Sequence, residues 1–338
     1  MANISIPRRQ TSGRLFREQL FREQSFREQM SRRQFLQRAM LSSAVLCFPN
    51  FAAATSDQAL RWQKLQDNVF LVRGPDFNAC VFSGNDGVCL IDGGTEAQSK
   101  QLLKLIRANC QQGLPQVLFN THWHRQQTGC NSMLGRHGAT IIAHENTKLW
   151  LTTEVISTWE NLTYSPLPKQ ALPNRTFFYD TQQLQFNGEA IEYGYLPQAH
   201  TDGDIYVRFA ERNIVIAGGV VAYDHFPIVD YVSGGWLGGM IDALKAIIAM
   251  TDEETVIVPA LGEPCKRTDV QRQLQLCENL IGKIATNYYR GLTYQDFLDT
   301  KPIDDSYLNR SSPDVFLRTA YEGVWWHIRE ARRWVKRS

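Results

Sequence analysis

Short apolar runs separated by turn-forming residues dominate the chain from about residue 62 onward. Runs of this kind, rich in β-branched and aromatic residues and bounded by Gly, Pro, Asn or Asp, are typical of β-strands. They predict strands at 68–74, 79–94, 115–121, 139–146, 189–200, 204–221 and 254–262. The run at 79–94 is expected to fold as a hairpin, because Asn85-Asp86-Gly87 supplies a tight turn in which Gly adopts a positive φ.

Helical spacing of apolar residues appears between these runs. In 95–110, leucines and isoleucine recur every three or four residues, and Thr95 can cap the helix. A second helix is predicted at 238–250, and another begins within 128–138. From 266 to 338 the chain reads as mainly helical, and five aromatic residues there are expected to pack on the core: Phe316, Tyr321, Trp325, Trp326 and Trp334.

Hairpins followed by alternating strands and helices, repeated in the second half, predict an α/β fold in which helices cover two sheets. We therefore expect one domain over 57–265, followed by a helical segment over 266–338. The chain has 338 residues, 43% of them apolar, which is enough for a sizeable core. Its net charge of +2 indicates no nucleic-acid partner.

The first 54 residues have a different character. Three copies of a five-residue repeat, LFREQ or SFREQ, occupy 15–29, and residues 1–29 are interpreted as a disordered extension. Residues 30–54 have the features of a twin-arginine signal peptide: Arg32-Arg33, a short apolar run, and Ala52-Ala53-Ala54 before a cleavage point. This pattern predicts export to the periplasm by the twin-arginine machinery, with translation starting at either Met1 or Met30.

The seven cysteines show no C-x-x-C spacing. Most have apolar neighbours and are expected to be small buried residues. Export leaves disulfides open, and their pairing is not readable from the sequence.

Two histidines follow a predicted strand in the stretch FNTHWHRQQTG. His122 and His124 can face one ion, because alternate residues of an extended chain point the same way. His200 follows another predicted strand, in QAHTDGD, and ligands from separate strand ends can converge on one zinc ion. The other histidines are interpreted as structural, although the one at 225 lies in a Gly-rich region that could line a pocket: His137, His144, His225 and His327.

In this order the motifs resemble those of the metallo-β-lactamase-fold hydrolases. That family has T-H-x-H-x-D-H, then G/A-H-T-x-G, then G-D, then P-G-H-G. The corresponding stretches here are 121–127, 199–204, 217–219 and 259–262, and Asp92 takes the position of a structural acid. The resemblance covers about 62–265 and implies an αββα sandwich. HFPIVDYVSGGWLGGMIDAL and FLRTAYEGVWW further resemble exported members such as the quinoprotein relay system metallohydrolases.

The resemblance implies one metal site in place of the family's two. The three-histidine set is intact in His122, His124 and His200, which are the expected ligands of a single ion, with zinc favoured by three imidazoles. The second set is replaced throughout, by Gln126, Gln127, Gly219 and Leu261.

The implied activity is hydrolysis of a small-molecule substrate, such as an ester, lactone or lactam, by water that the metal activates. Gln126 could hydrogen-bond to that water but could not take its proton. Candidates for a substitute acid are Asp202, Asp204, Asp224 and Asp230, the first two being more typical of turn caps. Arg125 is either an anchor for an anionic substrate or a structural residue. The alternative function is a non-catalytic periplasmic binding or accessory protein that keeps the fold.

Overall fold

The structure is a computed structural model that describes residues 59–338 except 112, 305–306, 308–311 and 335–338. The expected extension at 1–29 and signal peptide at 30–54 lie outside the described residues. The chain divides after Ser56, and Asp57–Ser338 forms one unit that includes both the expected domain and the helical segment after it.

Seven strands form the first sheet in the order β1-β2-β3-β4-β5-β6-β9. The first four strands pair antiparallel, and the pairs from β4 to β9 are parallel. Their bounds are β1 Arg61–Gln66, β2 Val69–Arg73, β3 Asn78–Gly84, β4 Gly87–Ile91, β5 Val117–Phe119, β6 Thr140–His144 and β9 Arg175–Phe177. The β3–β4 hairpin turns at Gly87, whose φ of 123° suits glycine, as the sequence predicted.

Five strands form the second sheet in the order β10-β11-β12-β13-β14, in which only the β13–β14 pair is parallel. Their bounds are β10 Thr181–Phe186, β11 Glu189–Tyr195, β12 Ile205–Phe209, β13 Ile214–Gly218 and β14 Val256–Pro259. A separate two-stranded hairpin joins β7 Val155–Ser157 to β8 Leu162–Tyr164.

The two sheets pack face to face through a buried layer of apolar side chains. Phe82 of the first sheet meets Phe209 of the second edge to face at 5.1 Å between ring centroids, and Phe119 meets Tyr193 in the same way at 5.0 Å. Edge-to-face pairs add to the stability that burial of such large side chains provides. This shared core fixes the strand ends of one sheet relative to those of the other.

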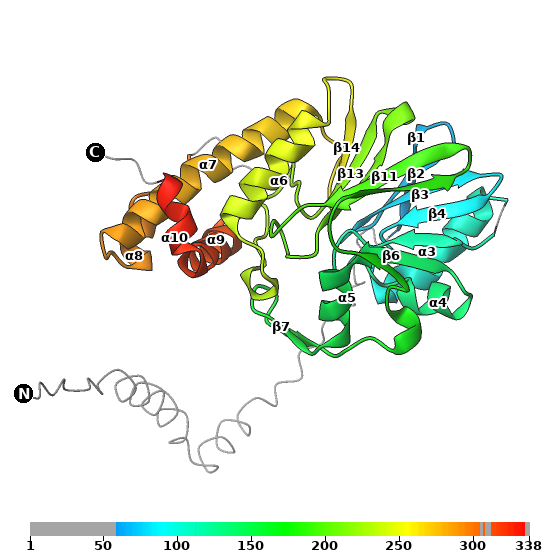
Figure 1. Cartoon of the computed structure of the whole chain (residues 1–338), viewed down its shortest axis with the longest axis horizontal. Helices are drawn as coiled ribbons and strands as arrows, with labels where there is room; N and C mark the ends of the chain where they lie inside the picture. The colour runs from blue at the N-terminus through cyan, green and yellow to red at the C-terminus, as the bar shows by residue number, and fades with distance from the viewer. Residues whose placement is uncertain (1–58, 112, 305–306, 308–311, 335–338) are drawn as a thin grey trace, which may run out of the picture. The chain divides into compact units, whose positions relative to one another are not determined.

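Helices cover the outer faces of both sheets (Figure 1). On the first sheet lie α3 Glu96–Asn109 and α4 Asn131–Arg136, whose Leu102, Ile106 and Leu134 are fully buried. Thr95 caps α3 by accepting a hydrogen bond from the Gln98 amide, as expected. The result is the αββα sandwich that the resemblance implied.

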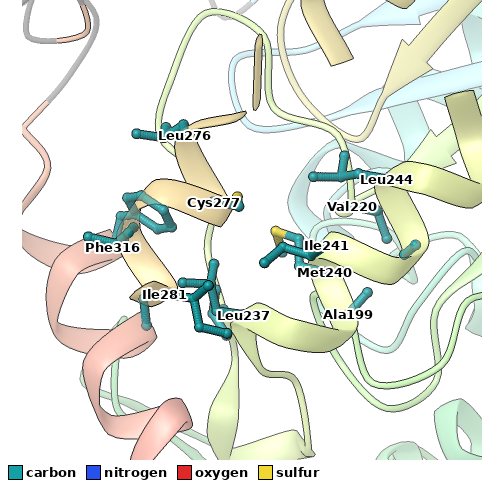
Figure 2. Packing of buried hydrophobic residues seen from close by; sticks show 14 of the residues in the cluster. Ala199, Val220, Leu237, Met240, Ile241, Leu244, Leu276, Cys277, Ile281 and Phe316 are labelled. Atoms are coloured by element: carbon teal, nitrogen blue, oxygen red, sulfur yellow. The ribbon is translucent and has the colours of Figure 1, made fainter. Parts of the chain in front are cut away.

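The second sheet is covered by α6 Leu237–Ala249 and by α7 Arg267–Tyr289. Figure 2 shows Leu237, Met240 and Ile241 of α6 facing Cys277 and Ile281 of α7, with Phe316 beside them. The C-terminal segment adds α8 Tyr294–Asp299, α9 Asp314–Trp326 and α10 Ile328–Ala331, and one-turn helices occur at η1 Lys169–Ala171, η2 Ala210–Arg212, η3 Tyr231–Ser233 and η5 Arg332–Trp334.

Several expectations differ from the structure. The strands β1, β7, β8, β9 and β10 lie outside the predicted ranges. The strand expected over 139–146 ends at His144, where α5 Glu145–Thr152 begins with the His144 side chain as its N-cap. In the C-terminal segment Phe316 and Tyr321 are buried as expected, but Trp325 and Trp326 are 54% and 72% exposed, because they end α9 on its outer side.

The six described cysteines are buried free thiols, in keeping with their apolar neighbours. Among the described helices none has the length and apolar character to cross a bilayer.

Candidate metal centre

Three buried histidines meet where strands of both sheets end. His122 and His124 follow β5 of the first sheet, and His200 follows β11 of the second. Their ring centroids are 4.6 to 4.8 Å apart, and one nitrogen from each ring lies within 4.8 Å of the others. The structure therefore brings together the three residues that the sequence singled out.

The outward nitrogen of each ring is held by an oxygen atom. Nδ1 of His122 lies 3.0 Å from Oγ1 of Thr121, Nε2 of His124 lies 3.0 Å from Oδ2 of Asp230, and Nδ1 of His200 lies 2.8 Å from the Ile228 carbonyl. A carbonyl or carboxylate oxygen only accepts, so His124 and His200 donate these bonds. The Thr121 hydroxyl donates its hydrogen to Asp92, at 2.8 Å, so the same oxygen accepts a hydrogen bond from His122.

In three neutral rings these bonds leave the inward nitrogens without hydrogens. Nδ1 of His124 and Nε2 of His200 are 3.1 Å apart, so two lone pairs face each other. Two acceptors at this distance repel unless a cation lies near both. The donor set therefore fits a metal ion, and the orienting oxygens are those that fix metal-binding imidazoles in other proteins.

Burial also favours the neutral rings that metal binding requires. The pKa of His122 is well below its usual value because of burial, and then because of repulsion from His200 and His124. The pKa of His200 is lowered to about 3, first by burial and then by repulsion from His124. Burial alone would raise the pKa of Asp230, but its hydrogen bond and charge interaction with His124 outweigh burial and lower it.

A network behind the histidines ties the two sheets together. Asp92 accepts from both the amide and the hydroxyl of Thr121, at 2.8 Å each, and the Thr121 carbonyl accepts from the Ile205 amide of β12. Burial raises the pKa of Asp92 to about 7, although the hydrogen bonds from Thr121 oppose this. The network holds the loop of His122 and His124 at a fixed place between the sheets.

The positions of the family's second metal set offer few ligands. A Cβ on Gly219 would lie 2.2 Å from Cδ2 of His200, so no side chain fits there without movement of the ring. The amide of Gln126 donates to Oε1 of Glu160 at 2.7 Å, and Leu261 has no donor atom. These residues line the cavity, and among the described residues they belong to no cluster of metal-ligating side chains.

The cavity above the three histidines has a volume of about 300 Å³. Apolar residues supply much of its wall, including Trp159 from the β7–β8 turn and Val221 and Leu261 from the second half of the chain. The indole of Trp159 lies 5.4 Å from the His124 ring. A larger cavity of about 650 Å³ lies along α7 and α8, but in the described residues the only cluster of metal-ligating side chains is that of the three histidines.

The four aspartates considered as substitutes for the missing catalytic acid lie in different parts of the structure. Asp204 accepts from the amide and hydroxyl of Thr201, and Asp202 accepts from the Trp150 indole, so both stabilise the loop after His200, as turn caps do. Asp230 lies behind His124 and not in the cavity, and Asp224 pairs with His225.

Arg125 points away from the metal centre. Its guanidinium donates to the Ser165 carbonyl and lies over the Tyr164 ring, in a different cavity from the one above the histidines. Its position supports the structural reading over the substrate-anchoring one.

The histidines outside the motif have different positions in the fold. Three of them make the contacts expected of structural residues. His137 is hydrogen-bonded to the Met133 carbonyl, and His144 accepts from the Asn146 amide. The ring of His327 stacks on Trp236. His225 lines the cavity, which is the position that its Gly-rich surroundings allowed. The sequence feature that could have pointed to His225 as a cavity residue is the acid next to it, Asp224, in the loop after Gly218-Gly219. The role of the Ile228 carbonyl in holding His200 could not be predicted from the sequence, because every residue has a backbone carbonyl.

Comparison with known proteins agrees with this geometry. The family model described as the metallo-beta-lactamase superfamily matches residues 65–262. The chain belongs to this superfamily, and with its three-histidine cluster the fold supports a metal-dependent hydrolase. Among curated proteins none matches the chain.

Solved structures share the fold at low sequence identity. A metallo-beta-lactamase from Pontibacter korlensis is 20% identical with a TM-score of 0.55, over 65% of this chain and all (100%) of that one. The metallo-beta-lactamase FIM-1 from Pseudomonas aeruginosa, in its mono-zinc form, is 15% identical with a TM-score of 0.53, over 65% and 95%. One from Hirschia baltica is 16% identical with a TM-score of 0.51, over 64% and 97%.

Proposed function

We propose that the protein is an exported hydrolase that holds one zinc ion on His122, His124 and His200 and cleaves an ester, lactone or lactam. The observation that carries the proposal is the convergence of three imidazole nitrogens within 4.8 Å, two of them 3.1 Å apart, with each ring held by an oxygen behind it. Three neutral imidazoles suit zinc, which accepts nitrogen ligands in tetrahedral geometry.

Zinc held by three histidines supplies Lewis acidity, which polarises a carbonyl group and makes water ionise near neutral pH. The chain's own residues do the rest. Thr121, Ile228 and Asp230 hold the imidazoles in one orientation, so that they do not reorganise during the reaction. The apolar wall, including Trp159 and Leu261, excludes bulk water and suits the uncharged part of a substrate.

The lack of space at Gly219 supports a single ion. A bridging carboxylate at that position would overlap His200, whose Cδ2 lies 2.2 Å from the place of a Cβ. A second ion would also need ligands at 126 and 261, where the amide of Gln126 is bound to Glu160 and Leu261 offers none. A mononuclear centre is therefore the form that these residues favour.

A second candidate function is a non-catalytic binding or accessory role with a structural metal. This accessory role is favoured by Gly219 and Leu261, which stand where the second metal set of the family has a carboxylate and a histidine. The open cavity of about 300 Å³ above the three histidines favours the enzyme, since a catalytic metal keeps a position open to water and substrate, whereas a structural metal is enclosed by its ligands.

Export is part of the proposal and is supported by Arg32-Arg33, the apolar run that follows and Ala52-Ala53-Ala54. The twin-arginine pathway carries folded proteins, which suits a protein that acquires its metal before export.

Metal analysis combined with hydrolysis assays tests the proposal. Protein recovered from the periplasmic fraction without added metal should contain about one zinc per chain and should hydrolyse at least one of a panel of esters, lactones and lactams. His124→Ala should lose both zinc and turnover, whereas His137→Ala, on the surface, should lose neither. Zinc without turnover on any of the panel would support the accessory role, and a folded metal-free protein would overturn the metal centre itself.

A further inference from the structure

The loop from Gly219 to Asp230 brings a fourth histidine to the cavity above the metal centre. His225 lines the same cavity as His122, His124 and His200, and its side chain is 28% exposed. It is not among the clustered metal-ligating side chains, so the proposed zinc ion leaves it without a role.

The imidazole of His225 is oriented by its neighbour in the chain. Its Nδ1 lies 2.8 Å from Oδ1 of Asp224. Because a carboxylate accepts, Nδ1 carries the hydrogen of the neutral ring, and Nε2 keeps its lone pair. A histidine held in this tautomer by a carboxylate is the arrangement that proton-transferring histidines use in hydrolases.

The loop is anchored from outside by the C-terminal helices. Gln273 of α7 is buried, accepts from the Ala222 amide at 2.9 Å and donates to the Val220 carbonyl at 2.9 Å. Phe226, next to His225, is 5% exposed and stacks on Phe316 of α9, with ring centroids 5.7 Å apart. These contacts hold both sides of the Asp224–His225 pair, so the ring has a fixed place at the cavity wall.

The reaction needs a proton acceptor that the rest of the site does not supply. Gln126 has a neutral amide that donates to Glu160, and Glu160 also accepts from the Tyr164 hydroxyl at 3.0 Å. Asp230 is committed to His124 behind the metal centre. Asp76 lines the cavity but lies on an exposed loop, and no side chain or amide among the described residues is hydrogen-bonded to its carboxylate.

We propose that His225 is the proton-transfer residue of the hydrolysis and that Asp224 is its positioning residue. As the oxygen of water bonds to the substrate carbonyl carbon, Nε2 of His225 takes the proton from that water. When the bond from that carbon to the leaving oxygen or nitrogen breaks, the same proton passes to the leaving group. Water is the only co-reactant, and the products are an acid and an alcohol or amine. This inference rests on the proposed hydrolase function.

Kinetics with substrates of graded leaving-group acidity test the role. His225→Gln, which keeps the size and hydrogen bonding, should lower kcat on alkyl esters about 100-fold or more, with KM little changed. On aryl esters with acidic leaving groups, which depart without a proton, the loss should be about 10-fold smaller. Asp224→Asn should show the same pattern, and His137→Gln should match the wild type on both substrates.

Two readouts are independent of turnover. All variants should hold the same amount of zinc as the wild type, which separates loss of proton transfer from loss of the metal. In ¹⁵N NMR spectra of metal-free protein, the neutral ring of His225 should carry its hydrogen on Nδ1, and Asp224→Asn should shift the population toward the other tautomer.

The outcomes distinguish the two proposals. Equal losses on alkyl and aryl esters would overturn proton donation to the leaving group. Wild-type rates in His225→Gln, or a His225 ring with its hydrogen on Nε2, would overturn the proton-transfer role as a whole and leave the hydrolase intact. Zinc-loaded wild type without turnover on any ester, lactone or lactam would overturn the proposed function and, with it, this inference.

Discussion

Asp230 and His124 are 106 residues apart in the chain, yet their side chains share a buried hydrogen bond of 3.0 Å. Asp230 is 1% exposed, and its carboxylate also accepts from the Ser233 hydroxyl at 2.6 Å. Its backbone amide donates to the His200 carbonyl at 2.9 Å. Asp230 therefore orients the ring of His124 and also holds the loop that carries His200.

Removal of this carboxylate should weaken metal binding. Asp230→Ala leaves the Nε2 hydrogen of His124 without a partner, so the zinc affinity should fall about 10- to 100-fold. Asp230→Asn should lose less, because its amide oxygen still accepts. Competition with a chelator of known affinity measures the change, and Asp299→Ala, an exposed acid on α8, serves as the control. Equal affinity in Asp230→Ala and the wild type would contradict the orienting role.

A methyl group at Gly219 should disturb the metal centre. Because the new Cβ would lie 2.2 Å from the His200 ring, Gly219→Ala forces that ring to move. We expect the free energy of unfolding to fall by about 1–3 kcal/mol, as in other overpacked sites, and zinc binding to weaken. Urea denaturation and metal titration measure the two effects.

The matched control for that variant is Gly323→Ala in α9, where the nearest atom to a new Cβ is 3.4 Å away. It should be neutral or slightly stabilising, since Ala is the better helix former. If Gly219→Ala behaved like Gly323→Ala, the steric account of the missing second metal set would be wrong.

The anchor between α7 and the cavity loop should contribute to stability. Gln273→Leu leaves the Ala222 amide and the Val220 carbonyl buried without their partner, at a cost of about 1–3 kcal/mol for each group. The loop that carries Ile228 and Asp230 should then loosen, so zinc affinity should fall as well. Gln275→Leu, at an exposed position of the same helix, should leave thermal stability and zinc affinity unchanged. A stable Gln273→Leu variant with full affinity would rule the anchor out.

The buried carboxyl of Asp92 should make stability depend on pH. Its pKa is raised from 3.8 to about 7 in the folded protein, mainly by burial. Between these values the unfolded chain has lost the proton that the folded protein keeps, so the free energy of unfolding falls as pH rises from about 4 to about 7.

Asp92→Asn removes this contribution. Relative to the wild type, the variant should therefore gain stability between about pH 4.5 and about pH 7.5, while contributions from the buried histidines cancel in the comparison. Urea denaturation of both metal-free proteins at the two pH values provides the test. Parallel pH dependences in the two proteins would mean that Asp92 is ionised throughout.

Export should depend on the paired arginines. Replacing Arg32 and Arg33 with Lys should retain the precursor in the cytoplasm, because the twin-arginine machinery reads the guanidinium pair and not its charge alone. Cell fractionation followed by immunoblotting measures this, with Arg8→Lys and Arg9→Lys, in the preceding extension, as the control. Periplasmic protein in the Arg32/Arg33 variant would refute the export proposal.

Much of the fold could be predicted from local sequence patterns. The hairpin at Gly87, the helix after Thr95 and the helix that begins at Leu237 all follow from short-range spacing and turn chemistry. The short strands β7, β8 and β9 were not predicted, because three residues are too few to show a period. The start of α5 was missed because its cap is the histidine that ends β6.

Candidate ligands followed from the sequence because their motifs are local. His122 and His124 lie in one short stretch, and His200 lies in a loop with its own motif. Each of the two motifs could therefore be recognised without the other. The cavity residue His225 could not be assigned in this way, since its loop has no regular spacing. Its position depends on contacts with Gln273 and Phe316, which lie far along the chain.

The sequence by itself therefore determined the layers of the fold and the three candidate imidazoles, because each is encoded in the types and spacing of nearby residues. The absence of a second metal set was implied by the resemblance to the metallo-β-lactamase fold. Only the tertiary structure decided which oxygen holds each ring, why Gly219 has no room for a side chain, and that a histidine bound to its neighbouring acid lines the cavity. Those relationships join residues from separate sheets and helices, and such distances exist only after the two sheets and the C-terminal helices have packed together.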